Sequence, residues 1–270
     1  MSDDILLHDL TDGVLVLTWN RPERNNGWTF DLEEAYFAAL IDAARNPEVR
    51  VIVVTGAGKT FCPGLDMLAL AESASGTAQY PRRRHPMTTA RWIPKPVIAA
   101  INGAAAGFGF IQAASCDVRF ASSSAKFTTA FARRGLPAEN SLSWMLPRII
   151  GTGAASDLLL SARVILADEA LTMGLVSRVV APQELLPTAL AYAKDLATNC
   201  SPGSMAAIKK QISDDWQRTS EEARLQSLVI VSELSASPDF AEGVASYQEK
   251  RLPNFPGLSA EVQVPLGWYR

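Results

Sequence analysis

The sequence predicts an α/β fold that continues into an all-helical C-terminal region. Two segments, residues 51–71 and residues 97–116, each have the pattern of a buried strand, a glycine-rich bend and an apolar helix. From residue 201 onward no strand pattern appears, and the periodicity is helical. We therefore expect an α/β core over residues 1–181 and a helical region over residues 182–270.

Local patterns place the elements that precede the first glycine-rich bend. Residues 14–19 are rich in β-branched and aromatic side chains and predict the first strand. Asp31 and Glu34 have the spacing of a capping box, which predicts a helix from there to Arg45. Residues 51–55, with the sequence VIVVT, predict the next strand, which ends at the bend.

The elements after the second bend follow in the same way. Residues 118–121 and 126–127 predict short strands, and residues 175–180 predict another. Pro137 suits the first turn of a helix that ends near residue 149. Further helices are expected over residues 153–161, 168–173, 184–198, 204–217, 220–235 and 240–250.

The two glycine-rich bends are the chemically informative part of this pattern. A strand that stops at a bend and restarts as a helix leaves backbone N–H groups at the helix start, and these groups suit a developing negative charge. Two such bends on neighbouring strands can each direct one N–H group at the same oxygen, as in an oxyanion hole. Ordinary strand-to-helix turns of an α/β fold have the same glycines, so spacing alone leaves both interpretations open.

Composition and charge argue against nucleic-acid and membrane partners. The chain has 270 residues, 48% of them hydrophobic, and a net charge of −3, which is typical of a soluble globular protein. Arg82-Arg83-Arg84 is the only basic cluster, and it falls in an expected loop over residues 72–90. The uncharged residues 97–116 are explained by a buried strand and a core helix rather than by a membrane span.

The N-terminus and the cysteines predict a cytoplasmic protein. Residues 1–4 are acidic and lack the order of a signal peptide. Cys62, Cys116 and Cys200 are odd in number, widely spaced and without a Cys-x-x-Cys pair. Free thiols in a reducing compartment are therefore expected, and no metal site is expected.

Seven strings along the chain resemble the crotonase, or enoyl-CoA hydratase/isomerase, superfamily. They are NRPERNN (20–26), FCPGLDM (61–67), KPVIAAINGAAAGFG (95–109), CDVRFAS (116–122), LPRIIG (146–151), GLVSRVV (174–180) and EKR (249–251). They occur in family order over nearly the whole chain. The resemblance implies the family's spiral of ββα units with a C-terminal helical region for oligomerisation and ligand cover. It also implies a homotrimer or homohexamer.

The resemblance further implies an acyl-CoA substrate whose thioester carbonyl oxygen lies between two backbone N–H groups. The matching positions are Leu65, directly after Gly64, and Phe108, between Gly107 and Gly109. The family often has glycine where this chain has Phe108. A backbone donor survives that change, but the ring reshapes the acyl pocket. No metal or redox cofactor is implied, since coenzyme A is part of the substrate.

The acid–base residues depart from the family's hydratases, which use two glutamates. This chain has Ile111 and Phe131 at those positions and retains a carboxylate at Glu139. A single acid at this position resembles the peroxisomal-type isomerases that convert 3-enoyl-CoA to 2-enoyl-CoA. We therefore predict Glu139 as the single acid/base. Without the resemblance, a glutamate shortly after a proline is typical of a surface residue at a helix start.

The remaining site residues are also assigned from the resemblance. Ile111, Phe131, Leu136 and Trp144 are expected to form an apolar acyl pocket. Three basic residues, Arg24, Lys250 and Arg251, are expected to bind coenzyme A, the last two in a neighbouring subunit. As an alternative, each of these three is a solvated surface charge. Asp66 is expected to cap its helix rather than to react.

Four functions remain open at this point. Double-bond isomerisation through Glu139 is the main prediction. A 2-enoyl-CoA hydratase that works with Glu139 alone is the first alternative, and a thioester or carbon–carbon hydrolase is the second. The loss of the glutamate pair also fits a catalytically silent acyl-CoA-binding subunit.

Overall fold

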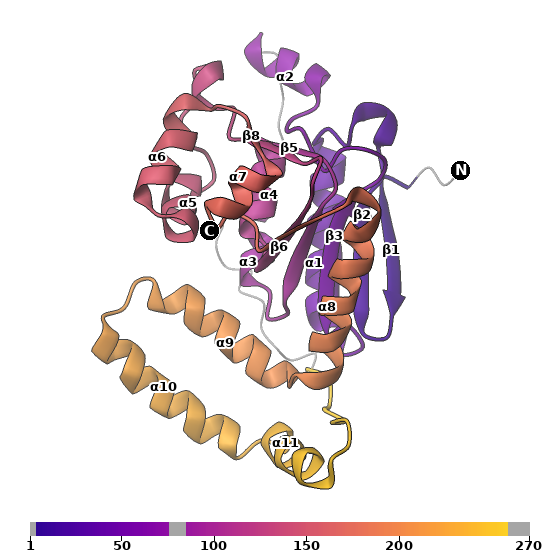
Figure 1. The fold of residues 1–270 in the computed structure, drawn as a ribbon, viewed down its shortest axis with the longest axis vertical. Coiled ribbons are helices and arrows are strands. Elements are labelled where there is room, and N and C mark those ends of the chain that lie inside the picture. The colour runs from indigo at the N-terminus through magenta and orange to yellow at the C-terminus, as the bar shows by residue number, and fades with distance from the viewer. Residues whose placement is uncertain (1–3, 76–84, 259–270) are drawn as a thin grey trace.

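A mainly parallel β-sheet forms the centre of the structure (Figure 1). The computed structural model describes residues 4–75 and 85–258, so the predicted basic loop at Arg82-Arg83-Arg84 lies outside the described residues. The strands are β1 (Leu6–Thr11), β2 (Val14–Trp19), β3 (Val51–Gly56), β4 (Val97–Ile101), β5 (Ala104–Ala106), β6 (Val118–Ser122), β7 (Lys126–Thr128), β8 (Ile165–Leu166) and β9 (Arg178–Val180). The helices are α1 (Phe30–Arg45), α2 (Met67–Ala74), α3 (Thr89–Trp92), α4 (Phe108–Ser115), α5 (Leu142–Ile150), α6 (Thr152–Ser161), α7 (Ala167–Thr172), α8 (Leu185–Asn199), α9 (Pro202–Asp215), α10 (Ser220–Ser235) and α11 (Pro238–Glu249).

The strand order of the large sheet is β1-β2-β3-β4-β6-β9. The β1–β2 pair is an antiparallel hairpin, and the other neighbouring pairs run parallel. A smaller sheet has the order β5-β7-β8. The two sheets together with the helices confirm the predicted α/β class.

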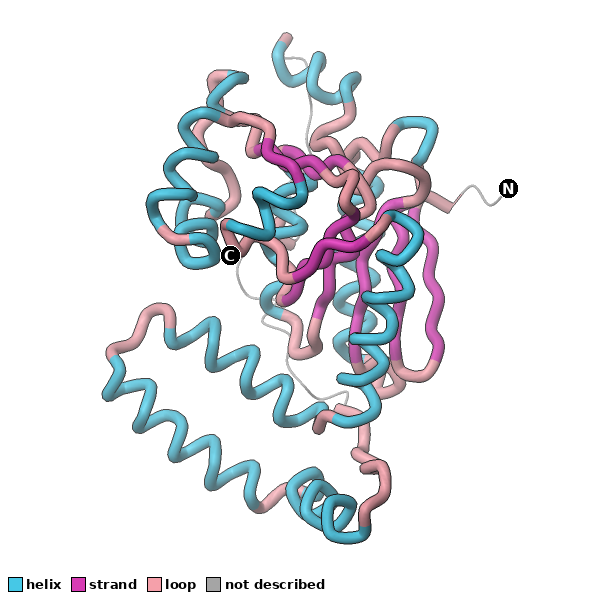
Figure 2. Tube along the Cα trace, in the orientation of Figure 1, coloured by secondary structure: helices cyan, strands magenta, loops and turns pink. Residues whose placement is uncertain are grey.

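The two faces of the large sheet pack against different helices. Val51 and Val53 of β3 share a hydrophobic cluster with Ala189 of α8, whereas Ile52 and Val54 belong to the main core together with residues of α1. Side chains alternate between the faces of a strand, so a strand covered on both sides is continuously apolar. Figure 2 shows α8 along one face of the sheet. This double burial explains why VIVVT has no polar position until its last residue.

Helices α9 and α10 form a hairpin that extends to one side of the sheet, and α11 follows it (Figure 1). Lys209 of α9 attaches this hairpin to the core. Its Nζ atom donates to the carbonyl oxygens of Ala90 at 2.8 Å and Lys95 at 2.9 Å. It also forms an ion pair with Asp117 at 2.7 Å. Because the Lys209 side chain is buried, these three oxygens supply the hydrogen bonds that water cannot.

Three expectations about local structure were wrong. Residues 14–19 are the second strand rather than the first, because Leu6–Thr11 forms an edge strand with one buried residue and no apolar alternation. The N-cap of α1 is Thr29, whose side chain accepts a hydrogen bond from the Leu32 N–H, and not the Asp31–Glu34 pair. The last strand is shorter than expected and begins at Arg178.

A fourth expectation, the helix that begins at Pro137, was also wrong. Helix α5 begins only at Leu142. Asn140 and Ser141 have φ angles of +50° and +62°, and this left-handed conformation is incompatible with a right-handed helix. The segment from Pro137 to Ser141 is therefore a bend that precedes the helix.

We predict that replacing Lys209 by methionine lowers the free energy of unfolding by about 3 kcal/mol, because it leaves buried oxygens without their donor. The adjacent Lys210 is the matched control, since its exposed side chain pairs only with Asp214 of the same helix. Lys210→Met is expected to cost less than about 1 kcal/mol. Chemical denaturation of both variants at one protein concentration measures the difference, and equal midpoints would contradict the anchoring role of Lys209.

Candidate active site

The two strand–glycine–helix segments are neighbours in the sheet. Strand β3 pairs with β4 in parallel, with Ile52 opposite Val97 and Val53 opposite Ile98. The segments that follow two parallel neighbours leave the sheet at the same edge. The bends after β3 and β4 are therefore brought together, as the sequence pattern requires for a shared function.

The glycines of the two bends touch. A Cβ atom built on Gly107 would lie 3.7 Å from the Cα atom of Gly64, and one built on Gly64 would lie 3.1 Å from the carbonyl oxygen of Ala106. Both residues have positive φ angles, +104° for Gly64 and +50° for Gly107. Only glycine adopts such angles without strain. Leu65 and Phe108, which each follow one of these glycines, consequently start from adjoining positions.

The backbone around Leu65 has a defined direction. The backbone N–H of Trp28 donates to the Gly64 carbonyl oxygen at 2.7 Å, and the backbone N–H of Asp66 donates to the Trp28 carbonyl oxygen at 2.9 Å. In a parallel bridge of this kind, the N–H and C=O groups of the middle residue point away from the partner. The Leu65 N–H therefore points to the side opposite Trp28. Phe108 is the first residue of α4, where N–H groups point along the helix axis beyond its start.

Helix α4 approaches the first bend closely at Gly109. A Cβ atom on this residue would lie 2.0 Å from the Cys62 carbonyl oxygen, which no side chain permits. The same segment is held by backbone hydrogen bonds from Cys62 to Ala104 and from Ala106 to Cys62. The start of α4 is thus fixed against the residues that lead to Leu65.

Asp66 connects this bend to the arginines of the string at residues 20–26. Its carboxylate accepts a hydrogen bond from the Leu68 N–H at 3.1 Å, which confirms its capping of α2. It forms ion pairs with Arg21 at 3.3 Å and Arg24 at 3.2 Å. Burial alone raises the pKa of Asp66, but the Leu68 N–H and Arg24 outweigh burial and lower it below the usual value. The carboxylate is therefore ionised at neutral pH.

Arg24, a predicted coenzyme A ligand, lies beside the candidate oxyanion residues in this way. Its side chain is 44% exposed although it contacts Asp66, so the guanidinium retains a surface for a ligand. Lys250 and Arg251 lie elsewhere in the chain. They follow α11, which Figure 1 places at the opposite end of the molecule from α2, and Arg251 pairs with Glu242 and Glu249. One chain therefore does not bring all three basic residues together.

Glu139 is half-buried in the bend before α5. Its carbonyl oxygen accepts a hydrogen bond from the Leu142 N–H at 2.9 Å. Leu142 is fully buried in the main core. The first residue of α5 thus fixes the backbone of Glu139. Glu139 itself lies between the exposed residues that precede it and the buried Leu142.

The predicted acyl-pocket residues occupy different environments. Ile111 and Phe131 are buried in the main core, and Trp144 and Phe108 pack against it. Leu136 is 42% exposed in the isolated chain. Four of these residues therefore belong to or contact the main core, and Leu136 lies at the surface. Their contact with an acyl chain stays a prediction, as do the roles of Glu139, Leu65 and Phe108.

Within residues 4–75 and 85–258, no group of three His, Cys, Asp or Glu side chains has an arrangement suited to a metal ion. In the same part of the chain, no helix is long and apolar enough to cross a membrane. Burial raises the pKa of Cys62 and that of Cys116 to about 12. Both thiols are therefore protonated at neutral pH.

Sequence reasoning missed the polar contacts that support the bends. Asn26 is buried, accepts from the Arg21 N–H, and donates to the carbonyl oxygens of Ala57 and Thr60. Asn26 and Arg21 both lie in the first family-like string, which was a usable signal. The pairing of Arg21 with Asp66 joins distant parts of the chain, and no local pattern indicates it.

The fold and this site define an α/β protein in which two neighbouring strand–glycine–helix junctions meet. The enoyl-CoA hydratase/isomerase family matches residues 9–258 of the chain. The 1,2-epoxyphenylacetyl-CoA isomerase of Escherichia coli (strain K12) is 34% identical over 268 residues, covering 95% of this chain and 100% of the relative. The (E)-benzylidenesuccinyl-CoA hydratase of Thauera aromatica is 36% identical over 255 residues, covering 92% and 98%.

Solved structures agree with the sequence relatives. The crystal structure of an enoyl-CoA hydratase from Polaromonas sp. JS666 superposes with a TM-score of 0.85 at 32% identity, covering 93% of this chain and 99% of that one. The chain belongs to the enoyl-CoA hydratase/isomerase family of the crotonase superfamily. It is an enzyme family that acts on coenzyme A thioesters, and the predicted crotonase fold is confirmed.

We predict that Gly64→Ala lowers turnover of an enoyl-CoA substrate by about 100-fold, the loss typical of one disturbed oxyanion donor. The added methyl group meets the Ala106 carbonyl oxygen and forces a strained φ angle just before Leu65. Gly174→Ala is the matched control, because Gly174 also has a positive φ angle, +77°, but has nothing within 4 Å of the added atom. Steady-state kinetics measure the turnover of both variants. Equal losses of turnover in Gly64→Ala and Gly174→Ala would refute a special role for Gly64.

Proposed function

We propose that the enzyme converts 3-enoyl-CoA to 2-enoyl-CoA, with Glu139 as the single acid/base and the Leu65 and Phe108 N–H groups as oxyanion donors. The contact between Gly64 and Gly107 carries this proposal, because it brings the two donor positions together. In the reaction, Glu139 removes a proton from C2 and the thioester becomes a dienolate. The two donors stabilise the charge on its oxygen. The same acid then returns the proton at C4.

The residues at the two positions that hold glutamates in the family's hydratases support isomerisation over hydration. Addition of water requires one group to activate water and another to protonate carbon. The positions that supply these groups in the family's hydratases hold the buried Ile111 and Phe131. A 1,3-proton shift needs one carboxylate, and both steps require it on the same side of the acyl chain. The reaction also needs no redox cofactor, because the substrate neither gains nor loses electrons.

Hydration of 2-enoyl-CoA is the second candidate. Several relatives, including the Thauera aromatica protein, are named as hydratases. Glu139 would then have to activate the water and return its proton to carbon in turn. The two reactions leave different products from the same substrate pair, so one experiment separates them.

An oligomeric assembly is part of the proposal. Helix α10 has no buried residue in the isolated chain, although Leu225, Leu228, Val229 and Val231 lie on it and are exposed. A helix with this many exposed apolar side chains is normally covered by a partner. A homotrimer or homohexamer provides that cover and also allows Lys250 and Arg251 to reach a neighbouring subunit's ligand.

We predict that Glu139→Gln lowers the rate of 3-enoyl-CoA isomerisation by about 100-fold to 10,000-fold, because glutamine keeps the shape but cannot accept a proton. The rise in 2-enoyl absorbance measures the reaction, and the exposed Glu48→Gln is the control. The same proteins are assayed with 2-enoyl-CoA. Loss of 2-enoyl absorbance to a hydroxyacyl product identifies a hydratase, and hydrolysis to free coenzyme A identifies a thioesterase. Tight binding of an acyl-CoA without turnover of either isomer supports a silent subunit.

A further inference from the structure

Two tryptophans join the helical hairpin to the segment that holds Glu139. Trp216 is the C-cap residue of α9, and Trp144 lies in the first turn of α5. Their ring centroids are 4.8 Å apart with an interplanar angle of 63°, an edge-to-face contact that stabilises aromatic pairs. The end of α9 and the start of α5 are therefore in direct contact through these two rings.

Two arginines enclose the tryptophan pair. The Arg91 guanidinium lies 3.7 Å from the centroid of Trp216 and 5.3 Å from that of Trp144. The Arg148 guanidinium lies 4.3 Å from the centroid of Trp144, and its Nη1 atom donates to the Trp144 carbonyl oxygen. Each such contact is an electrostatic attraction between the cation and the face of the ring. We call Arg91, Trp144, Arg148 and Trp216 the arginine–tryptophan cluster.

Arg91 depends on this cluster to an unusual degree. Its Nε and Nη2 atoms are buried and have no hydrogen-bond partner within the described part of the chain. Burial lowers the pKa of Arg91 to about 10, Asp117 opposes this shift, and Arg148 adds to it. The group is still charged at neutral pH. The face of Trp216, 3.7 Å from the guanidinium carbon, together with the charge of Asp117 therefore compensates for the two buried nitrogen atoms.

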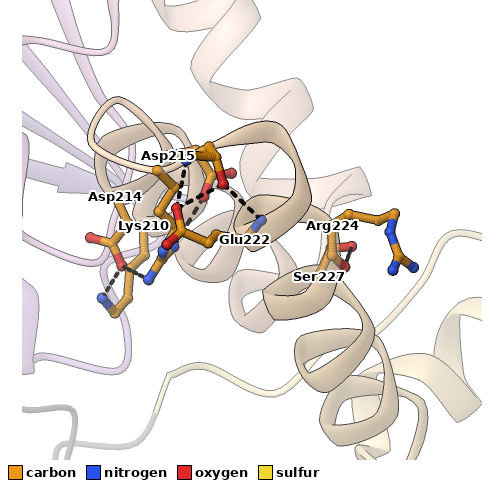
Figure 3. Close-up of polar contacts among 8 residues, drawn as sticks. Lys210, Asp214, Asp215, Glu222, Arg224 and Ser227 are labelled. Atoms are coloured by element: carbon orange, nitrogen blue, oxygen red, sulfur yellow. Dashed lines mark hydrogen bonds and ion pairs between the residues drawn. The ribbon is translucent and has the colours of Figure 1, made fainter.

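The end of α9 is rigidly built where Trp216 projects from it. Figure 3 shows the turn between α9 and α10, in which Asp214 lies between Lys210 and an arginine. That arginine, Arg218, also bonds Asp215 at 3.0 Å. Thr219 and Glu222 then form a reciprocal capping box at the start of α10. Together with the Lys209 anchor, these contacts hold Trp216 at a fixed position relative to the core.

The position of Trp144 determines the position of Glu139. The Trp144 N–H donates to the Ser141 carbonyl oxygen at 3.0 Å, and the Leu142 N–H donates to that of Glu139 at 2.9 Å. Asn140 and Ser141 between them have positive φ angles, so the bend is strained and needs support from its surroundings. A shift of the first turn of α5 therefore moves the bend and with it the Glu139 side chain.

We propose that Trp216 is a positioning residue for Glu139: by stacking on Arg91 and meeting Trp144 edge-to-face, it holds the first turn of α5 at the distance from the glycine bends that proton transfer requires. The proposal rests on the proposed function for the catalytic role of Glu139. The claim that Trp216 fixes the first turn of α5 does not depend on that role. The proposal assigns a role in the reaction to the C-terminal hairpin of the same chain.

The test compares Trp216→Leu with Trp216→Phe and with Gln217→Leu, a leucine at the adjacent exposed position. Trp216→Leu is expected to lower kcat about tenfold or more with KM changed less than about twofold, since a small misplacement of a reacting group reduces the rate of the chemical step. Trp216→Phe retains an aromatic face and is expected to restore most of kcat. Gln217→Leu is expected to behave as the unchanged protein. An unchanged kcat in Trp216→Leu would overturn the proposal.

Hydrogen exchange separates failure of this proposal from failure of the proposed function. Amide exchange over residues 139–145 is expected to accelerate in Trp216→Leu and not in Gln217→Leu, whether or not the protein isomerises an enoyl-CoA. If exchange in this segment is unchanged, the positioning role is wrong even where the unchanged protein is an isomerase. Arg91→Lys provides a second variant that keeps the charge but loses the planar stack. It is expected to accelerate the same amides, and the absence of that effect would also count against the cluster.

Discussion

The contact between Gly64 and Gly107 is the constraint on which the site depends. Two peptide planes approach each other there because neither residue has a Cβ atom and both have positive φ angles. Gly109, in the first turn of α4, must also lack a Cβ atom, because only a hydrogen atom fits against the Cys62 carbonyl oxygen. Backbone N–H groups held in this way do not reorganise when charge develops, which is what makes such donors effective in catalysis.

The rest of the fold places the bends at that contact. Strands β3 and β4 are adjacent and parallel, with Val53 opposite Ile98, so their ends coincide. Asp66, the residue after Leu65, forms ion pairs with Arg21 and Arg24. These pairs connect the first bend to the loop that follows β2. Ionised Asp66 lies between two cations in this arrangement, and we propose that a coenzyme A phosphate binds at the exposed side of Arg24. The same arginine thus serves the structure and, in our proposal, the ligand.

Sequence patterns predicted the parts of the fold that depend on local chemistry. The strand at Val97–Ile101 and the helix at Ser220–Ser235 coincide with the predicted residues, since a continuous apolar run and helical periodicity are local signals. The start of α5 was wrong because Pro137 is a local signal, whereas the left-handed residues before Leu142 respond to the packing of Leu142 in the core. The arginine–tryptophan cluster joins α3, α5 and α9, and no single sequence indicates contacts between such distant segments.

In our proposal, the absence of the glutamate pair changes what the remaining groups can do and favours isomerisation over hydration. A buried Ile111 and Phe131 offer an attacking water no acceptor, and a water held by one carboxylate alone keeps much of its freedom of orientation. Proton return to the dienolate has no such difficulty, because the acid that removed the proton is already in contact with the chain. With a single carboxylate, however, both proton transfers depend on the position of one flexible side chain. If both proposals hold, support of the α5 bend by Trp216 matters more in this chain than it would beside two glutamates.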